Sequence, residues 1–198
     1  MSKKEITASL VKELRQICGV SVMECKKALE KSQGNLEEAM KWLKQKGREK
    51  AMKKAQRETK EGVVASYIHS NKKVGAMIEL YCETDFAAKG RDFQDLAYDL
   101  AMHVAAMDPQ YLSAEKVGRK EKEEYENLVK EESSLTKKPA EIADKIIEGK
   151  LKKHFGERSL LSQPFIKNTD MNVDELIKER IAKIGENIQI GDFVRFEI

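Results

Sequence analysis

The stretch AMIELYCETDFAAKGRDF, residues 76–93, decides the fold class, because the spacing of its apolar residues changes within it. Its first part alternates two sets of residues, Ala76, Ile78, Leu80 and Cys82 against Met77, Glu79, Tyr81 and Glu83. That alternation predicts a strand with one buried face. A stripe at helical spacing follows, formed by Phe93, Leu96, Ala97, Leu100, Ala101 and Val104, before Asp108 and Pro109 end the helix. We therefore expect a sheet that this helix covers.

Two more strands complete the predicted sheet. Residues 63–68 are expected to form a strand that precedes the one just described. Only the short polar segment 69–73 separates the two, which predicts an antiparallel hairpin. At the C-terminus, Val194, Phe196 and Ile198 alternate with Arg195 and Glu197 and predict a third strand. The fold class is therefore α+β, with a small three-stranded antiparallel sheet covered by helices.

Three short helices with N-terminal capping residues precede the sheet. The caps are Thr7, Ser21 with Glu24, and Asn35 with Glu38, and the expected ends are Gly19, a point near Gly34, and Gly47. Three capped helices joined by short turns predict a compact bundle. The basic segment 48–60, with its sparse apolar face, is interpreted as a helical linker.

The remaining sequence predicts more helices and a division into domains. Residues 113–132 are highly charged and indicate a solvated helix or arm, Pro139 begins a helix that ends at Gly156, and Asn172 with Glu175 caps a last helix that stops at Gly185. We expect a helical head at residues 1–50, a basic helical linker at 51–61 and an α+β body at 62–198.

Composition and motifs exclude several classes of function. Charged residues make up 36% of the chain, but the net charge is only +3, so the overall balance does not point to a polyanion such as nucleic acid. No HExxH, GxSxG, P-loop or GxGxxG motif is present, which favours a binding protein over an enzyme. The cysteines Cys18, Cys25 and Cys82 form no CxxC pair, are odd in number and have no histidine cluster nearby, which argues against a disulfide framework and a zinc site. No aspartate cluster has the spacing of a metal-binding loop, and we expect no metal and no cofactor.

The N-terminus has no apolar core of signal-peptide length, and no stretch approaches 18 uncharged apolar residues. We therefore expect a cytoplasmic protein without membrane contact. The basic segment 48–60 carries no interleaved aromatic residue for stacking on bases, so direct nucleic-acid binding is not expected.

The turn after the predicted strand, Glu83 to Gly90, is the one local pattern that is unusual for scaffold. It places Phe86 between Asp85 and small residues. Either Phe86 folds back into the core while Thr84 or Asp85 caps the next helix, or it is displayed beside a carboxylate as an anchor for a partner. His103, in an otherwise apolar helix, is likewise open to two interpretations, as a packed residue or as a functional one.

Several long segments, taken in order, resemble the bacterial elongation factor Ts family along nearly the whole chain. They are ITASLVKELRQICGVSVMECKKALEKSQGNLEEAMKWLKQKG, LYCETDFAAKGRDF, AMHVAAMDPQYL, KPAEIADKIIEGKLKKHFGE, SLLSQPFI and AKIGENIQIGDFVRFEI. The resemblance implies a guanine-nucleotide exchange factor whose partner is elongation factor Tu, preferentially in its nucleotide-free state. It also implies that the head has a fold like the ubiquitin-associated domain and docks on the partner's GTPase domain through Val22, Met23 and Lys26.

The same resemblance assigns roles in the body of the chain. Thr84, Asp85 and Phe86 match the loop that intrudes on the partner and leads to loss of its bound Mg²⁺. His103 and the turn at Ile184 and Gly185 match further contacts near that site. Ala87 stands where the family usually has valine, so this position departs from the family pattern.

The chain resembles the short members of the family, which carry a single core module. This implies a symmetric homodimer through the body, and we expect it to be non-covalent because no cysteine lies near the C-terminal strand. The alternatives are an adaptor like the ubiquitin-associated domain, an RNA-binding protein that uses the head and the basic linker, and an uncharacterised enzyme.

Overall fold

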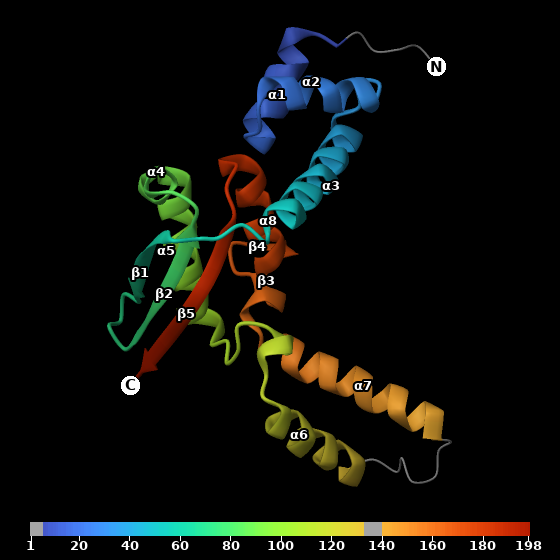
Figure 1. The fold of residues 1–198 in the computed structure, drawn as a ribbon, viewed down its shortest axis with the longest axis vertical. Helices are drawn as coiled ribbons and strands as arrows, with labels where there is room; N and C mark the ends of the chain where they lie inside the picture. Colours follow the sequence, from blue (N-terminus) through green and yellow to red (C-terminus); the bar gives the residue numbers. More distant parts are fainter. Residues whose placement is uncertain (1–5, 133–139) are drawn as a thin grey trace. The chain divides into compact units, whose positions relative to one another are not determined.

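The computed structural model describes residues 6–132 and 140–198 (Figure 1). The elements in order are α1 (Ala8–Cys18), α2 (Val22–Lys31), α3 (Leu36–Lys54), β1 (Glu61–Ile68), β2 (Val74–Cys82), α4 (Asp85–Lys89), α5 (Arg91–Met107), the short 3-10 helix η1 (Ala114–Lys116), α6 (Arg119–Glu132), α7 (Ala140–Glu157), the 3-10 helix η3 (Leu160–Ser162), β3 (Pro164–Phe165), β4 (Asn168–Asn172), α8 (Val173–Ile184) and β5 (Ile188–Glu197). The predicted start of a helix at Pro139 lies outside the described residues.

The α+β class and the small three-stranded antiparallel sheet are confirmed. The strand order is β1-β2-β5, so the two strands of the predicted hairpin are neighbours and the C-terminal strand pairs with β2. A separate antiparallel ribbon joins β3 to β4, with Pro164 opposite Asn172 and Phe165 opposite Asn168.

The chain divides into two compact units. The first holds the residues up to Val64 together with 80–97 and 175–191, and the second holds 65–79, 98–174 and 192–198. The domain ranges expected from the sequence, 1–50, 51–61 and 62–198, follow composition and stay a prediction.

In the first unit, the three predicted helices of the head form as expected because their caps are satisfied. The Thr7 hydroxyl accepts the Leu10 N–H at 3.3 Å, and the Ser21 hydroxyl accepts the Glu24 N–H at 3.3 Å. The Asn35 side chain accepts the Glu38 N–H at 3.2 Å. One apolar core unites the helices, formed by Val11, Leu14, Cys25, Ala28, Leu29, Ala39 and Leu43. The likeness of this bundle to the ubiquitin-associated fold stays a prediction.

The expected end of the third helix at Gly47 is wrong, because α3 continues without a break to Lys54. Gly47 is buried inside the helix, and a Cβ atom built on it would lie 3.2 Å from the Ala182 Cβ. The glycine therefore allows close packing against α8 instead of ending the helix. Part of the segment interpreted as a linker is thus the last turns of α3.

The apolar faces predicted for the strand at residues 76–82 and for the long helix that follows it are both buried. Ala76, Ile78, Leu80 and Cys82 on β2 and the whole stripe of α5 lie in the interior. The third strand begins earlier than expected, at Ile188, and its buried residues are Ile188 and Ile190. Its alternating apolar residues, Val194, Phe196 and Ile198, are exposed, whereas Arg195 is directed inward and donates to the Ala105 carbonyl at 2.9 Å.

In the second unit, the charged segment expected as a solvated helix or arm forms α6, which pairs with α7 (Figure 1). Val129 and Ile147 are buried between the two helices, and Tyr125 and Ile146 pack around them. Ile142 on α7 is exposed. The sparse apolar residues of α6 are therefore sufficient to hold one partner helix.

Candidate functional site

The turn that follows β2 ends in the short helix α4, and Thr84 caps it. Thr84 has an extended backbone, and its hydroxyl accepts the Ala87 N–H at 3.2 Å. Phe86, in the first turn of α4, is 84% exposed, whereas Ala87 and Ala88 are buried. The interpretation of Phe86 as a core anchor is therefore wrong, although the capping by Thr84 that accompanied it is confirmed. The Phe86 ring therefore contributes little to the core of its own chain.

The carboxylate beside this ring is also exposed. Lys89 donates to Asp85 at 2.8 Å, and this hydrogen bond together with the lysine charge lowers the pKa of Asp85. Asp85 therefore remains ionised at neutral pH. Such a solvent-exposed ion pair contributes little to stability, so the carboxylate is available to exchange its lysine partner for another donor.

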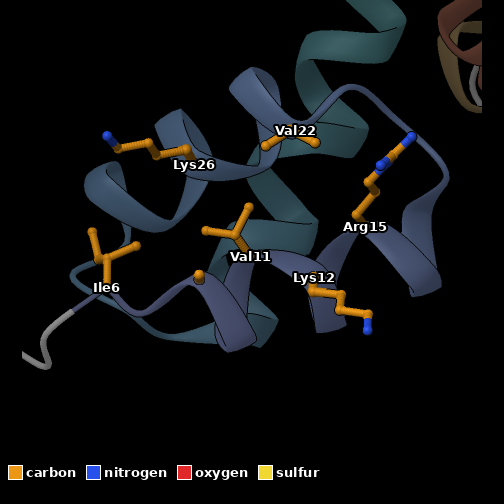
Figure 2. A pocket seen from close by; sticks show the side chains of 7 residues that line it. Ile6, Val11, Lys12, Arg15, Val22 and Lys26 are labelled. Carbon is orange, nitrogen blue, oxygen red and sulfur yellow. The ribbon is translucent and has the colours of Figure 1, made fainter.

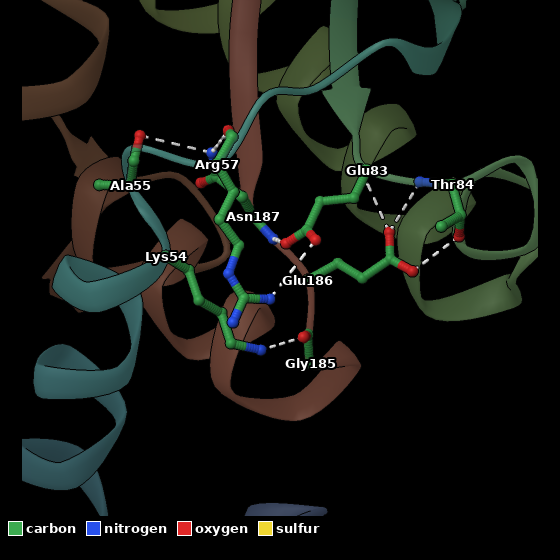
Figure 3. A network of polar contacts seen from close by, with 8 residues as sticks. All are labelled: Lys54, Ala55, Arg57, Glu83, Thr84, Gly185, Glu186 and Asn187. Carbon is green, nitrogen blue, oxygen red and sulfur yellow. Dashed lines mark hydrogen bonds and ion pairs between the residues drawn. The ribbon is translucent and has the colours of Figure 1, made fainter.

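The second predicted turn, Ile184 and Gly185, belongs to the same compact unit as Thr84. Figure 3 shows Gly185 and Thr84 in one close-up of polar contacts. Gly185 has a left-handed backbone, with φ +91, and ends α8 as expected. Its carbonyl accepts a hydrogen bond from Lys54 at the end of α3. Directly after it, Glu186 accepts the Thr84 hydroxyl at 2.6 Å.

Sequence reasoning missed three residues of this polar network, Glu83, Glu186 and Asn187. An acid and an amide directly after a helix-ending glycine were the only local signal for two of them. The hydrogen bonds from Thr84 to Glu186 and from Asn187 to Glu83 each join residues more than 100 positions apart, so no local pattern could have paired them.

The three head residues predicted to contact a partner lie at or beside a pocket of about 470 Å³ between α1 and α2 (Figure 2). Its lining is Ile6, Ala8, Val11, Lys12, Arg15, Val22 and Lys26. The pocket therefore has apolar walls with cationic groups among them. Met23 is 62% exposed and follows Val22 on α2. Such a surface fits a partner segment that combines apolar and acidic side chains.

His103 does not share this exposure, because its side chain is 0% exposed. Its Nδ1 accepts the Ile166 N–H at 3.3 Å, so its Nε2 carries the proton and donates to the Gln163 amide oxygen at 3.1 Å. Burial lowers the pKa of His103. A partner contact at His103 stays a prediction, and in this conformation the ring positions the β3 segment, where it stacks on Phe165.

Within residues 6–132 and 140–198, no three His, Cys, Asp or Glu side chains converge in a way that would hold a metal ion. None of the helices in this part of the chain is long and apolar enough to cross a membrane.

Comparison with known proteins places these features in a family. The profile of a family described as Elongation factor TS matches residues 2–198. A protein of Thermosipho melanesiensis named Elongation factor Ts is 48% identical over 193 residues, which cover 98% of each chain. A protein of Thermodesulfovibrio yellowstonii with the same name is 49% identical over 197 residues, which cover 98% of this chain and 96% of that one.

Proposed function

Because the chain belongs to the elongation factor Ts family, we propose that it is a guanine-nucleotide exchange factor for elongation factor Tu in translation elongation. Its action is then binding and not covalent catalysis, and it takes place in the cytoplasm, where translation occurs. The single observation that carries the mechanism is Phe86, an 84% exposed aromatic ring beside the ionised Asp85.

In this mechanism the turn from Thr84 to Ala87 enters the partner beside its Mg²⁺ and phosphate site. The Phe86 ring separates apolar side chains of the partner, and the Asp85 charge disturbs the surroundings of the cation. Mg²⁺ leaves, GDP loses the cation that neutralises its phosphates, and the nucleotide dissociates. The exchange factor accelerates this release only if it binds the empty GTPase more tightly than the loaded one.

The free energies indicate that the turn does not act alone. Burying one phenylalanine side chain contributes roughly 1.5–3 kcal/mol. Moving a population from 1:99 to 99:1 requires about 5.5 kcal/mol. A second contact must therefore supply the difference.

We assign that second contact to the head. Its pocket offers Val22 with Lys26, and the exposed Met23 adds apolar area beside it. Once the head is bound, the turn meets its target at a raised effective concentration, because both belong to one chain. Ile184 and Gly185 supply a smaller contact next to the turn.

We also propose a non-covalent homodimer through the body, supported by the exposed apolar residues of the sheet in the second unit. They are Ile68 on β1, Met77 on β2, and Val194, Phe196 and Ile198 at the C-terminal end. Exposed apolar residues on the neighbouring strands of one sheet are compatible with an interface between copies of a chain. None of the cysteines lies in this segment, so no disulfide would join the copies.

The experiment that tests the function is the release of a fluorescent GDP from elongation factor Tu after an excess of unlabelled nucleotide is added. Substoichiometric amounts of the protein should accelerate the release. The acceleration should diminish when Mg²⁺ is raised to saturate the partner. If the release rate does not change at any concentration of the protein, the proposal is wrong.

A further inference from the structure

The carboxylate of Glu186 accepts hydrogen bonds from two consecutive residues, Glu83 and Thr84, where the chain passes from β2 into α4 (Figure 3). Its Oε2 accepts the Glu83 N–H at 3.1 Å and the Thr84 N–H at 3.0 Å. Its Oε1 accepts the Thr84 hydroxyl at 2.6 Å. Three donors on one ionised acceptor make a strong, directional attachment.

The attachment is reciprocal. The backbone of Glu83 donates to Glu186, and its side chain accepts the Asn187 N–H at 2.6 Å and a hydrogen bond from the Arg57 guanidinium at 3.4 Å. The buried Asn187 side chain then donates to the Arg57 carbonyl at 2.8 Å and the Ala55 carbonyl at 3.5 Å. The start of the turn is thus connected to the segment after α8 and to the end of α3, all within one compact unit.

The Thr84 hydroxyl transmits this attachment to Phe86. A hydroxyl has a single hydrogen, and here that hydrogen is given to Glu186, which leaves a lone pair for the Ala87 N–H at 3.2 Å. Glu186 therefore fixes the rotation of the group that caps α4. The direction in which α4 presents the ring and the Asp85 carboxylate depends on that cap.

We infer that Glu186 is a positioning residue for nucleotide exchange, because it holds the Thr84 cap so that Phe86 and Asp85 are presented together as one rigid group. This inference rests on the proposed function. The advantage of such an arrangement is preorganisation, because a turn that is already ordered loses less conformational entropy when it enters the partner.

The test compares Glu186→Gln and Glu186→Ala with the parent chain. Glutamine is nearly isosteric, but it replaces one acceptor with an NH₂ group that faces a donor. We expect the maximal rate of GDP release to fall about tenfold in both variants. The concentration that gives half-maximal acceleration should change less than about twofold, because the head contacts are intact. Glu123→Gln, at an exposed ion pair of α6, is the matched control and should behave as the parent does.

Two further measurements separate positioning from general loss of structure. Thr84→Ser keeps the hydroxyl and should reduce the maximal rate less than Thr84→Val does. The double variant Glu186→Ala with Thr84→Val should be little worse than either single variant, because both break the same connection.

Hydrogen exchange in the free protein tests the attachment without the partner. The amides of Glu83, Thr84 and Ala87 should exchange faster in Glu186→Ala, whereas amides of α1 should not change. If those three amides keep their protection, or if the half-maximal concentration rises while the maximal rate is unchanged, the inference is wrong. If the parent chain does not accelerate the release of GDP from elongation factor Tu, the proposed function itself is refuted instead.

A second, independent observation concerns two thiols in the head. The sulfur atoms of Cys18, the last residue of α1, and Cys25 on α2 lie 3.6 Å apart. A disulfide bond is about 2.05 Å long, so the sulfurs need to approach by only about 1.5 Å. Cys25 is fully buried, and burial is the main reason that its pKa is raised to about 12. Cys18 is only partly buried.

We propose that this pair is a reversible disulfide site that reacts with small-molecule disulfides such as oxidised glutathione. The Cys18 sulfur, which belongs to the less buried of the two residues, attacks the reagent, forms a mixed disulfide and releases one glutathione thiolate. Cys25 then loses its proton, attacks the Cys18 sulfur and releases the second glutathione. Two protein thiols are oxidised and one glutathione disulfide is reduced to two thiols. The new bond fixes the spacing of α1 and α2 at the head pocket.

Mass spectrometry of the full chain after incubation with oxidised glutathione tests this proposal. The parent should lose two hydrogen atoms through a bond between the peptides of Cys18 and Cys25. Cys25→Ser should stop at one glutathione adduct on Cys18, and the buried Cys82 should remain unmodified in both proteins. A parent chain that retains the glutathione adduct, or that forms only bonds between chains, would overturn it.

Discussion

The substitution Phe86→Ala separates the role of this ring in the fold from its role toward a partner. The side chain is 84% exposed, so its removal takes little apolar surface out of the interior. Substitutions at such surface positions usually change the free energy of unfolding by less than about 0.5 kcal/mol. The helix cap is unaffected as well, because it is made by Thr84 and the Ala87 N–H. We therefore expect the melting temperature of the variant to match that of the parent.

The substitution should instead reduce the acceleration of GDP release. If the ring is buried in the partner, its loss removes most of the roughly 1.5–3 kcal/mol that a phenylalanine contributes on burial. Since every 1.4 kcal/mol corresponds to a factor of ten, we expect the acceleration of GDP release to fall about 10- to 100-fold. The assay is stopped-flow release of labelled GDP, with circular dichroism melting in parallel.

Leu128→Ala is a suitable control, because Leu128 is an exposed apolar residue on α6. It should change neither the melting temperature nor the release of GDP. The reasoning would be refuted if Phe86→Ala melted several degrees lower, which would indicate a structural role for the ring. It would also be refuted if the variant accelerated release as well as the parent does.

Three further predictions follow from the head, the buried histidine and the sheet. Lys26→Glu reverses a charge in the head pocket and should weaken binding to the GTPase about tenfold in titration calorimetry, whereas Lys31→Glu, on the same helix outside the pocket lining, should have little effect. Burial lowers the pKa of His103 below its usual 6.5, so its contribution to the free energy of unfolding is complete above that pH and is lost as the pH falls toward the lowered pKa. Denaturant melts between pH 7.5 and 5 should show this slope. His103→Gln should reduce the slope and leave the contribution of His154, whose pKa is lowered in the same direction. Phe196→Lys places a charge on the exposed face of β5 and should shift the mass measured by light scattering from that of a dimer toward the 22.6 kDa of one chain; an unchanged mass would contradict a dimer through this face.

The features that local sequence patterns encode were predictable. The alternation in β2 and the stripe of α5 depend only on the direction of neighbouring side chains, and both proved to be buried. The caps at Thr7, Ser21 and Asn35 depend on residues within a single turn, and all three form.

Features that depend on distant residues were not predictable. Gly47 looks like a helix end from its neighbours, but its role is set by Ala182 on another helix. The alternation near the C-terminus predicted a strand but not which of its faces points inward, and at that point the inward side is taken by Arg195, which donates to the Ala105 carbonyl. The direction of Phe86 was undecided because capping by Thr84 is compatible with a buried or an exposed ring. The contacts of Glu186 with Glu83 and Thr84 could not be predicted, because they join residues more than 100 positions apart in the sequence.

Because α3 is continuous, the number of residues between the head and the contact with α8 determines how the head is rotated about the axis of α3. The helix has 19 residues and so spans about 28 Å. Its first half carries Ala39 and Leu43 into the core of the head, and Gly47 meets Ala182 further along. Each residue turns the helix by about 100°, so one alanine inserted after Lys44 would swing the head to a different side of the axis. Four inserted residues would nearly restore the angle while moving the head about 6 Å outward. If the head docks on a partner as proposed, the register of α3 sets the direction from which it does so.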